Sequence, residues 1–163
     1  MVTVEYLVNQ LQLEPHPEGG YFKETYRSDL KSGFDGFQGE RNVSTGIYFL
    51  LEANDFSAFH RIKSDEMWHF YEGHTLEVHM ILDDGTHEVV KLGRNLDEGE
   101  QLQFVVPAGA WFGSRVEQGG SFSLVGCTVA PGFDFKDFEM PTAKELIKSF
   151  PKQEVIIQEM TRE

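Results

Sequence analysis

The stretch from residue 59 to residue 73, FHRIKSDEMWHFYEG, constrains the fold more than any other part of the chain. It has the composition of two short β-strands around a turn, and it spaces His60, Glu66 and Gly73 by 6 and then 7 positions. Because side chains alternate between the two faces of a strand, Ile62 shares a face with His60. If the two strands are antiparallel neighbours, His60 and Glu66 meet near one end of the pair.

Short alternating segments continue on both sides of this stretch, separated by turn signals such as Asp83-Asp84-Gly85 and Gly119-Gly120. The predicted strands are 21–27, 44–51, 57–62, 67–71, 75–82, 88–92, 102–106, 111–116 and 121–129. Many short strands at even spacing are typical of a sandwich or barrel. We therefore predict an all-β protein with one domain over residues 1–163 and a sandwich or barrel core over about 21–130.

The two ends of the chain carry helical patterns instead. Residues 3–13 place apolar side chains at helical spacing, with Thr3 as the N-cap. Two short helices are expected over about 141–160, where Pro141 and Pro151 suit first-turn positions. The Gly-rich, polar segment 29–42 is expected to be a surface loop or a mobile flap.

Charge and cysteine content narrow the partners. The chain has 14 Lys and Arg against 27 Asp and Glu, a formal net charge of −13, which disfavours nucleic acid and anionic membrane surfaces as partners. Cys127 is the single cysteine and is expected to be a buried core residue rather than a nucleophile. Without a signal-peptide pattern or an apolar run of about 20 residues, the protein is expected to be cytoplasmic.

The stretch 59–73 resembles the first motif of the cupin superfamily, G-x5-H-x-H-x3-4-E-x6-G. The second superfamily motif, G-x5-P-x-G-x2-H-x3-N, survives only in its central Pro107-x-Gly109. The positions of the two motifs fall on Asn54, His60, Ile62, Glu66 and Gly73, and on Gln101, Pro107, Gly109, Phe112 and Val116.

Five separated segments are similar to a narrower group, small single-domain cupins of unknown function. They are PHPEGGYFKETYRS (15–28), STGIYFLL (44–51), SDEMWHFYEG (64–73), VPAGAWFGSRV (106–116) and GCTVAPGFDFKDFEM (126–140). The resemblance implies a double-stranded β-helix, or cupin jelly-roll barrel, with short flanking helices, assembled as a homodimer. It does not imply an assigned reaction.

The resemblance also bears on metal binding. Metal-binding cupins take ligands from both histidines of the first motif, its glutamate and the histidine of the second. Ile62 and Phe112 replace two of these four, and catalytic metal sites normally need about three protein ligands. We therefore predict no metal and no other cofactor. His69 or His79 completes a ligand set only if it points inward, and alternation turns His69 away unless a bulge intervenes.

In layout the sequence is similar to the sugar-nucleotide epimerases of the superfamily (RmlC-like), which use a strand histidine as a general base and a tyrosine as the acid. By this resemblance His60 is the candidate base, Glu66 its partner and Tyr48 the candidate acid. The expected walls of the substrate pocket are aromatic, with His79 either a polar wall residue or solvent-facing. The other predicted wall residues are Trp68, Phe70, Trp111 and Phe112.

Three functions remain open from sequence. The first is a metal-independent isomerase or epimerase acting on a small sugar-like or polar carbonyl compound. The second is a module that binds a small molecule without chemistry, and the third is a metal-dependent cupin. Arg27, Arg41 and Arg115 could meet an anionic ligand, but surface salt bridges are the stronger expectation for all three.

Overall fold

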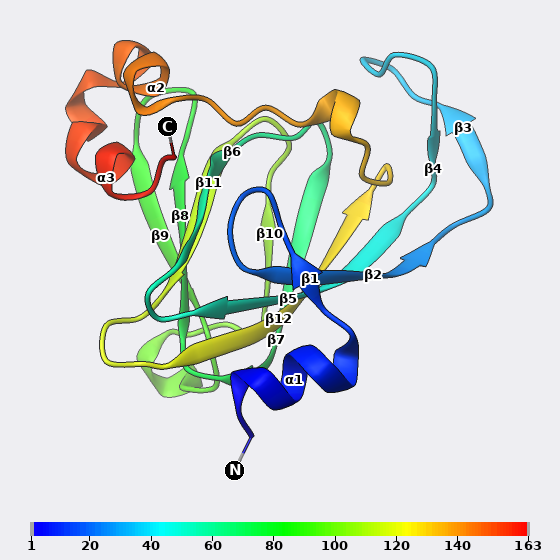
Figure 1. The fold of residues 1–163 in the computed structure, drawn as a ribbon. Coiled ribbons are helices and arrows are strands. Elements are labelled where there is room, and N and C mark those ends of the chain that lie inside the picture. The colour runs from blue at the N-terminus through cyan, green and yellow to red at the C-terminus, as the bar shows by residue number, and fades with distance from the viewer. Residues whose placement is uncertain (1, 163) are drawn as a thin grey trace.

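A computed structural model, which describes residues 2–162, contains two large antiparallel β-sheets and a separate two-stranded one (Figure 1). The larger sheet has the strand order β1-β2-β5-β12-β7-β10, and the smaller has the order β6-β11-β8-β9. The larger sheet is built from β1 (Glu14–Pro15), β2 (Tyr21–Arg27), β5 (Thr45–Glu52), β7 (Asp65–Gly73), β10 (Gln103–Val106) and β12 (Phe122–Ala130). The smaller consists of β6 (Phe56–His60), β8 (Leu76–Ile81), β9 (His87–Leu92) and β11 (Trp111–Val116).

Alternate residues of both sheets face a shared apolar core. Phe49 of β5, Trp68 of β7 and Val125 of β12 meet Val78 of β8 and Phe112 of β11, all at most 1% exposed. Burying apolar side chains from two sheets against each other is what stabilises such a sandwich. The predicted jelly-roll barrel with short flanking helices is confirmed.

Three α-helices flank the sheets. α1 (Val4–Leu11) begins at Thr3, whose side chain accepts the Tyr6 backbone N–H. α2 (Ala143–Ser149) and α3 (Glu154–Glu159) cover the outer face of the smaller sheet, where Phe59 and Ile81 pack against them. Figure 1 shows these two helices beside β8 and β9, far from the hairpin of β3 (Lys31–Gly33) and β4 (Glu40–Asn42). Single 3₁₀ turns are η1 (Leu96–Glu98), η2 (Phe135–Asp137) and η3 (Pro151–Gln153).

All the strands predicted from sequence are present, and their ends differ by no more than two residues. The prediction for 29–42 was wrong in one respect, because β3 (Lys31–Gly33) and β4 (Glu40–Asn42) form a short hairpin within the segment. Within residues 2–162, no helix is both long and apolar enough to cross a lipid bilayer.

A steric constraint explains why position 73, the last of the motif 59–73, is a glycine. Its φ of +94° lies in the left-handed region, and a Cβ there would approach the Phe122 carbonyl oxygen to 2.4 Å. Glycine is the residue that accepts both the backbone angle and the contact. The position therefore serves the β7–β12 pairing rather than any chemistry.

Candidate functional site

One cavity of about 600 Å³ lies inside the barrel and contains several of the buried ionisable groups. Its polar lining includes His16, Glu18, His60, Glu66 and Cys127. Its apolar lining consists of Phe22, Ile47, Ile62, Val129, Phe133 and Phe135. Glu14, Lys23, Glu24, Arg27, Thr45 and Asp134 complete the wall.

An irregular pairing between β6 and β11 determines which β6 side chains face this cavity. Phe112 and Ser114 of β11 pair with His60 and Ser57 of β6, so the single residue between the pairs on β11 faces two residues on β6. Simple alternation would put Ser57 and His60 on opposite faces, but a β-bulge changes that parity. Both side chains consequently reach Glu18: the Ser57 hydroxyl donates to Glu18 Oε1 at 3.0 Å, and His60 Nε2 lies 3.1 Å from Glu18 Oε2.

The hydrogen bonds of His60 determine its tautomer. Nδ1 lies 2.7 Å from the Ala58 carbonyl oxygen, which can only accept, so Nδ1 carries a hydrogen. In the neutral ring Nε2 is then an acceptor facing a carboxyl oxygen. Two acceptors at 3.1 Å require a proton between them. Glu18 and His60 therefore share one proton.

Burial decides where that proton resides. The His60 ring lies against Phe112 and Phe138, with ring centroids 4.1 Å and 5.3 Å away. Burial lowers the pKa of His60 to about 4, although the Ala58 carbonyl opposes the shift. Burial also raises the pKa of Glu18, although the interaction with His16 and the hydrogen bond from Ser57 act to lower it. Both directions favour the uncharged pair, in which the Glu18 acid donates to a neutral His60.

Glu66 enters the cavity from β7 in the opposite sheet. The premise that its strand neighbours the His60 strand was wrong, because β6 and β7 belong to different sheets. Burial, together with the nearby Glu18, raises the pKa of Glu66 to about 8, and Cys127 opposes the rise. Glu66 is thus protonated at neutral pH. Burial likewise raises the pKa of the Cys127 thiol, which stays protonated and is no nucleophile.

His16 is the second histidine of the cavity. Its Nδ1 accepts the Glu18 backbone N–H at 3.1 Å, so the neutral ring carries its hydrogen on Nε2. Burial lowers the pKa of His16, while Glu18 raises it and His60 lowers it further. The neutral cavity therefore has one histidine with a free Nε2–H and another whose Nε2 is an acceptor.

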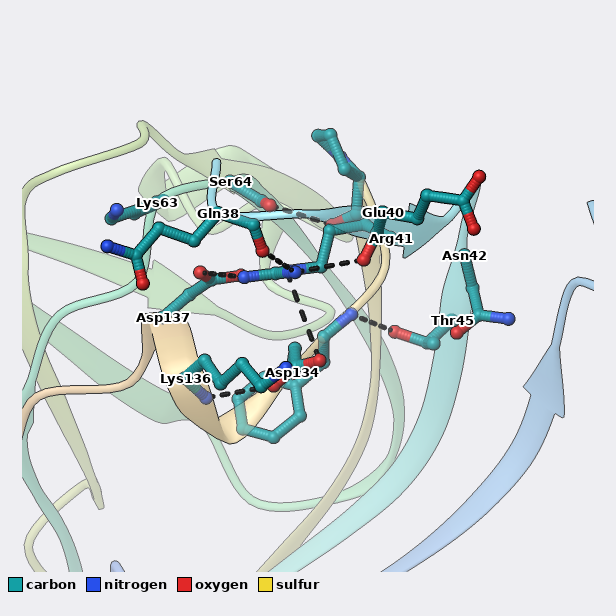
Figure 2. Close-up of polar contacts among 12 residues, drawn as sticks. Gln38, Glu40, Arg41, Asn42, Thr45, Lys63, Ser64, Asp134, Lys136 and Asp137 are labelled. Atoms are coloured by element: carbon teal, nitrogen blue, oxygen red, sulfur yellow. Dashed lines mark hydrogen bonds and ion pairs between the residues drawn. The ribbon is translucent and has the colours of Figure 1, made fainter. Parts of the chain in front are cut away.

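A buried ion pair supports the outer wall of the cavity. Figure 2 shows Arg41 reaching from β4 to Asp137, to which Nε and Nη2 donate at 2.8 Å each. Arg41 is 3% exposed, so the expected surface salt bridge is instead a buried one. Its Nη1 donates to the Gln38 and Glu40 carbonyl oxygens. The hairpin is thereby joined to the segment that places Phe133 in the wall.

Several residues predicted for the site lie elsewhere. Tyr48 faces outward from β5 and packs near α1 and against Tyr71, because Ile47 and Phe49 occupy the inward positions. His79 lies on the outer face of β8, bonded to His87 and Glu77.

The predicted aromatic walls divide between the core and the outer surface. Trp111 packs under the C-terminal helices, on the outer face of its sheet. Trp68 and Phe70 are buried in the core outside the cavity lining, and Phe112 reaches the site only through the His60 ring. His69 faces outward, as alternation predicts, and contacts Thr128 and Gln103.

The site depends on two residues that sequence reasoning did not assign, His16 and Glu18. Both lie in the segment PHPEGG before β2, which was recognised only as part of a resemblance. The available signal was the presence of two ionisable residues, a histidine and a glutamate, in a segment otherwise made of prolines and glycines. Their distance in sequence from His60 gives no periodic clue.

The residues present do not fit the metal site of the superfamily described above. Ile62 and Phe112 occupy two of the four ligand positions, are buried, and have no donor atoms. Across residues 2–162, no three His, Cys, Asp or Glu side chains are grouped as metal ligands. No step of the chemistry below is therefore assigned to a metal.

Comparison with known proteins places this geometry in a family. A family model described as "Cupin superfamily (DUF985)" matches residues 5–141. An uncharacterized protein of Saccharomyces cerevisiae, YML079W, is 31% identical over 159 residues, covering 90% of this chain and 79% of that protein.

Two solved structures are similar over nearly the whole chain. A hypothetical protein from Leishmania major has a TM-score of 0.95 and 39% identity, covering 99% of this chain and 100% of that one. Protein SO0799 from Shewanella oneidensis has a TM-score of 0.90 and 40% identity, covering 99% of each chain.

Proposed function

Since the chain belongs to the family DUF985 of the cupin superfamily, we propose that the protein binds a small polar carbonyl compound in its barrel cavity and isomerises this compound by proton transfer. The observation that carries the proposal is the Glu18–His60 contact of 3.1 Å inside a cavity that is also lined by Glu66, whose pKa burial raises to about 8. Pairs of titratable groups whose environments separate their proton affinities are typical of acid–base sites.

The proposed roles follow from the protonation states. Glu18 passes its proton to His60 Nε2, and the Glu18 carboxylate so formed takes a proton from the carbon next to the carbonyl group. The step leaves an imidazolium beside the Glu18 acid. Glu66 donates its proton to the carbonyl oxygen, which gives an enol. Return of the protons to the other face or to the neighbouring carbon yields an epimer or an isomer, and no oxidant or reductant is consumed. Glu66 replaces Tyr48 as the acid.

The ligand class follows from the lining. Burial disfavours charge on Glu18, His60 and Glu66 in the inner cavity. The cavity wall contains the aromatic rings of Phe22, Phe133 and Phe135. At the rim the Arg27 guanidinium is engaged by Glu24 at 2.6 Å. A small, uncharged, sugar-like molecule matches this environment better than a sugar nucleotide, whose phosphates need basic partners.

Solvent-exchange measurements test the proposal. Aldoses, ketoses and α-hydroxy ketones are incubated with the protein in D₂O, and ¹H NMR follows loss of the signal from the hydrogen next to the carbonyl. We expect exchange that His60→Gln lowers by about 10²- to 10⁴-fold, the usual contribution of a general base. Exchange that is equally fast in His60→Gln rules out the role of the pair.

A non-catalytic binding module is the second candidate, and the aromatic wall favours it. Native mass spectrometry of the purified protein distinguishes the two: a retained small molecule that is never converted supports binding alone. The same spectrum reports metal. A stoichiometric metal ion would support the metal-dependent alternative instead.

The homodimer and the cytoplasmic location are proposed on the family resemblance and on the unpaired, buried Cys127. Light scattering at micromolar concentration and cell fractionation check them. A monomer mass, or recovery of the protein outside the cytoplasmic fraction, contradicts the corresponding proposal.

A further inference from the structure

The strand that carries His60 lies at the edge of the smaller sheet, and other parts of the chain cover that edge. The Ala58 N–H donates to the Glu18 carbonyl oxygen at 2.8 Å, and the Phe59 N–H donates to the Met160 carbonyl oxygen at 2.9 Å. Two segments therefore form backbone hydrogen bonds with neighbouring residues of β6. One is the loop that contains Glu18, and the other is the segment that follows α3.

Arg162 joins these segments through one guanidinium group. Its Nη2 donates to the Phe56 carbonyl oxygen and to Asp55 Oδ1, each at 2.6 Å, and its Nε donates to the Glu18 carbonyl oxygen at 3.3 Å. The guanidinium also lies over the Phe56 ring, 4.1 Å from its centroid. A planar group with fixed donors suits such a three-way contact, whereas a lysine ammonium does not.

Asp55 holds the other side of the same loop. Its Oδ2 accepts the Gly20 N–H at 2.9 Å, and its Oδ1 accepts the Phe56 N–H at 2.8 Å. Partial burial would raise the pKa of Asp55, but these two N–H groups and Arg162 outweigh burial and lower it. The carboxylate is therefore charged and fastens the residue that follows Glu18 by two positions.

Gly19 completes the attachment. Its φ is +112°, and a Cβ at this position would lie 2.0 Å from the Phe56 carbonyl oxygen and 2.4 Å from Arg162 Nη2. The loop is in direct contact with β6 and Arg162 at this point, with no space for a side chain. The backbone that follows Glu18 is thus held by Arg162, directly at the Glu18 carbonyl group and through Asp55 at the Gly20 N–H.

Resting on the function proposed above, we propose that Arg162 is a positioning residue that holds the Glu18 carboxyl against His60. The C-terminal end of the chain thereby sets the geometry of the proton-transfer pair. Arg162 lies outside the cavity lining and touches no reacting group, so it acts through the Glu18 loop.

A purely structural role for Arg162 would be to dock the C-terminal helix. Arg115 provides the matched control, because it also ties that helix to the barrel. Its Nη1 donates to Glu159 of α3 at 2.9 Å and its Nε lies 3.4 Å from Glu77, but it makes no contact with the Glu18 loop. Loss of Arg115 loosens α3 without releasing Glu18.

The test is an NMR titration of the full-length protein with labelled histidine, in which the His60 signals are assigned by comparison with His60→Gln. Glu18, His16 and Glu66 line the same cavity and also titrate. Each variant is therefore followed over the whole pH range in which the protein stays folded. In the wild type we expect a His60 pKa of about 4 and hydrogen on Nδ1. Arg162→Ala should admit water to the pair and raise that pKa by about one unit or more.

Arg115→Ala should leave the His60 titration unchanged, and Arg162→Lys should restore it only in part. The proposal is overturned if Arg162→Ala titrates like the wild type, or if Arg115→Ala shifts His60 as much as Arg162→Ala does. If Arg162→Ala does not fold, Asp55→Asn takes its place with the same expected rise. No substrate is needed, so the result stands even if no isomerisation is found.

Discussion

His60 Nε2 lies 3.1 Å from Glu18 Oε2, while the Nδ1 atom of the same ring lies 2.7 Å from the Ala58 carbonyl oxygen. The carbonyl takes the only ring hydrogen, so the contact with Glu18 requires a proton that the carboxyl supplies. A glutamine at position 18 could still donate to Nε2 but could not pass on a proton. Glu18→Gln should therefore keep the fold and lower C–H exchange by about 10²- to 10⁴-fold.

Thermal unfolding and the D₂O exchange assay together check this prediction. Ser57→Ala removes only the hydrogen bond to Glu18 Oε1 and should have a much smaller effect on exchange. An active Glu18→Gln protein would show that the shared proton plays no part in the chemistry.

Glu66 should make stability depend on pH. Its pKa of about 8 in the folded chain exceeds the ordinary 4.5, so the folded state holds a proton that the unfolded state releases. Its contribution is fully present below about pH 4.5 and is lost as the pH rises through about 8. Glu66→Gln should flatten the fall of the urea midpoint over this range. The exposed Glu98→Gln is the control, and an equal slope in Glu66→Gln and wild type would contradict the shift.

Removing one charge of the buried Arg41–Asp137 pair should destabilise the protein more than removing both charges. Arg41→Ala leaves the Asp137 carboxylate buried without its partner and should lower the melting temperature strongly. The double variant Arg41→Met, Asp137→Leu removes both charges and should recover much of the loss. A double variant no more stable than Arg41→Ala would show that the charge pair itself is needed.

Tyr48 faces away from the cavity and should be dispensable for chemistry. Tyr48→Phe removes only the phenol hydroxyl from the outer face of β5, so C–H exchange should stay within about twofold of wild type. A tenfold loss in the D₂O assay would return Tyr48 to the role of acid that the epimerase resemblance suggested.

Gly19 should tolerate alanine far less well than Gly36. Both have positive φ, but a Cβ at Gly36 meets nothing within 4 Å, whereas at Gly19 it meets the Phe56 carbonyl oxygen at 2.0 Å. Gly36→Ala should cost about 1–2 kcal/mol from the backbone angle alone. Gly19→Ala should cost at least about twice as much, measured by urea unfolding. Equal losses would mean that the Glu18 loop can move away from β6.

Alternation along the strands and glycine at the turns predicted an all-β protein and the positions of its strands, because both follow from local backbone geometry that a sequence displays directly. The same rule put Ile62 on the face of His60 and turned His69 away. These two conclusions needed only neighbouring residues. The resemblance to the superfamily motifs implied in addition that Ile62 and Phe112 replace two of the four metal ligands.

Only the tertiary structure decided the composition of the site. Glu18 reaches His60 from a separate loop, and a bulge in β6 puts Ser57 beside it against the parity of a regular strand. Tyr48 was misplaced because the relative facing of strands in two different sheets depends on register, which no local pattern encodes. Periodicity therefore identified the strands and the face that His60 shares with Ile62, and the family resemblance identified the barrel. The proton partner came from long-range packing, where loop closure and burial bring together residues that are distant in sequence.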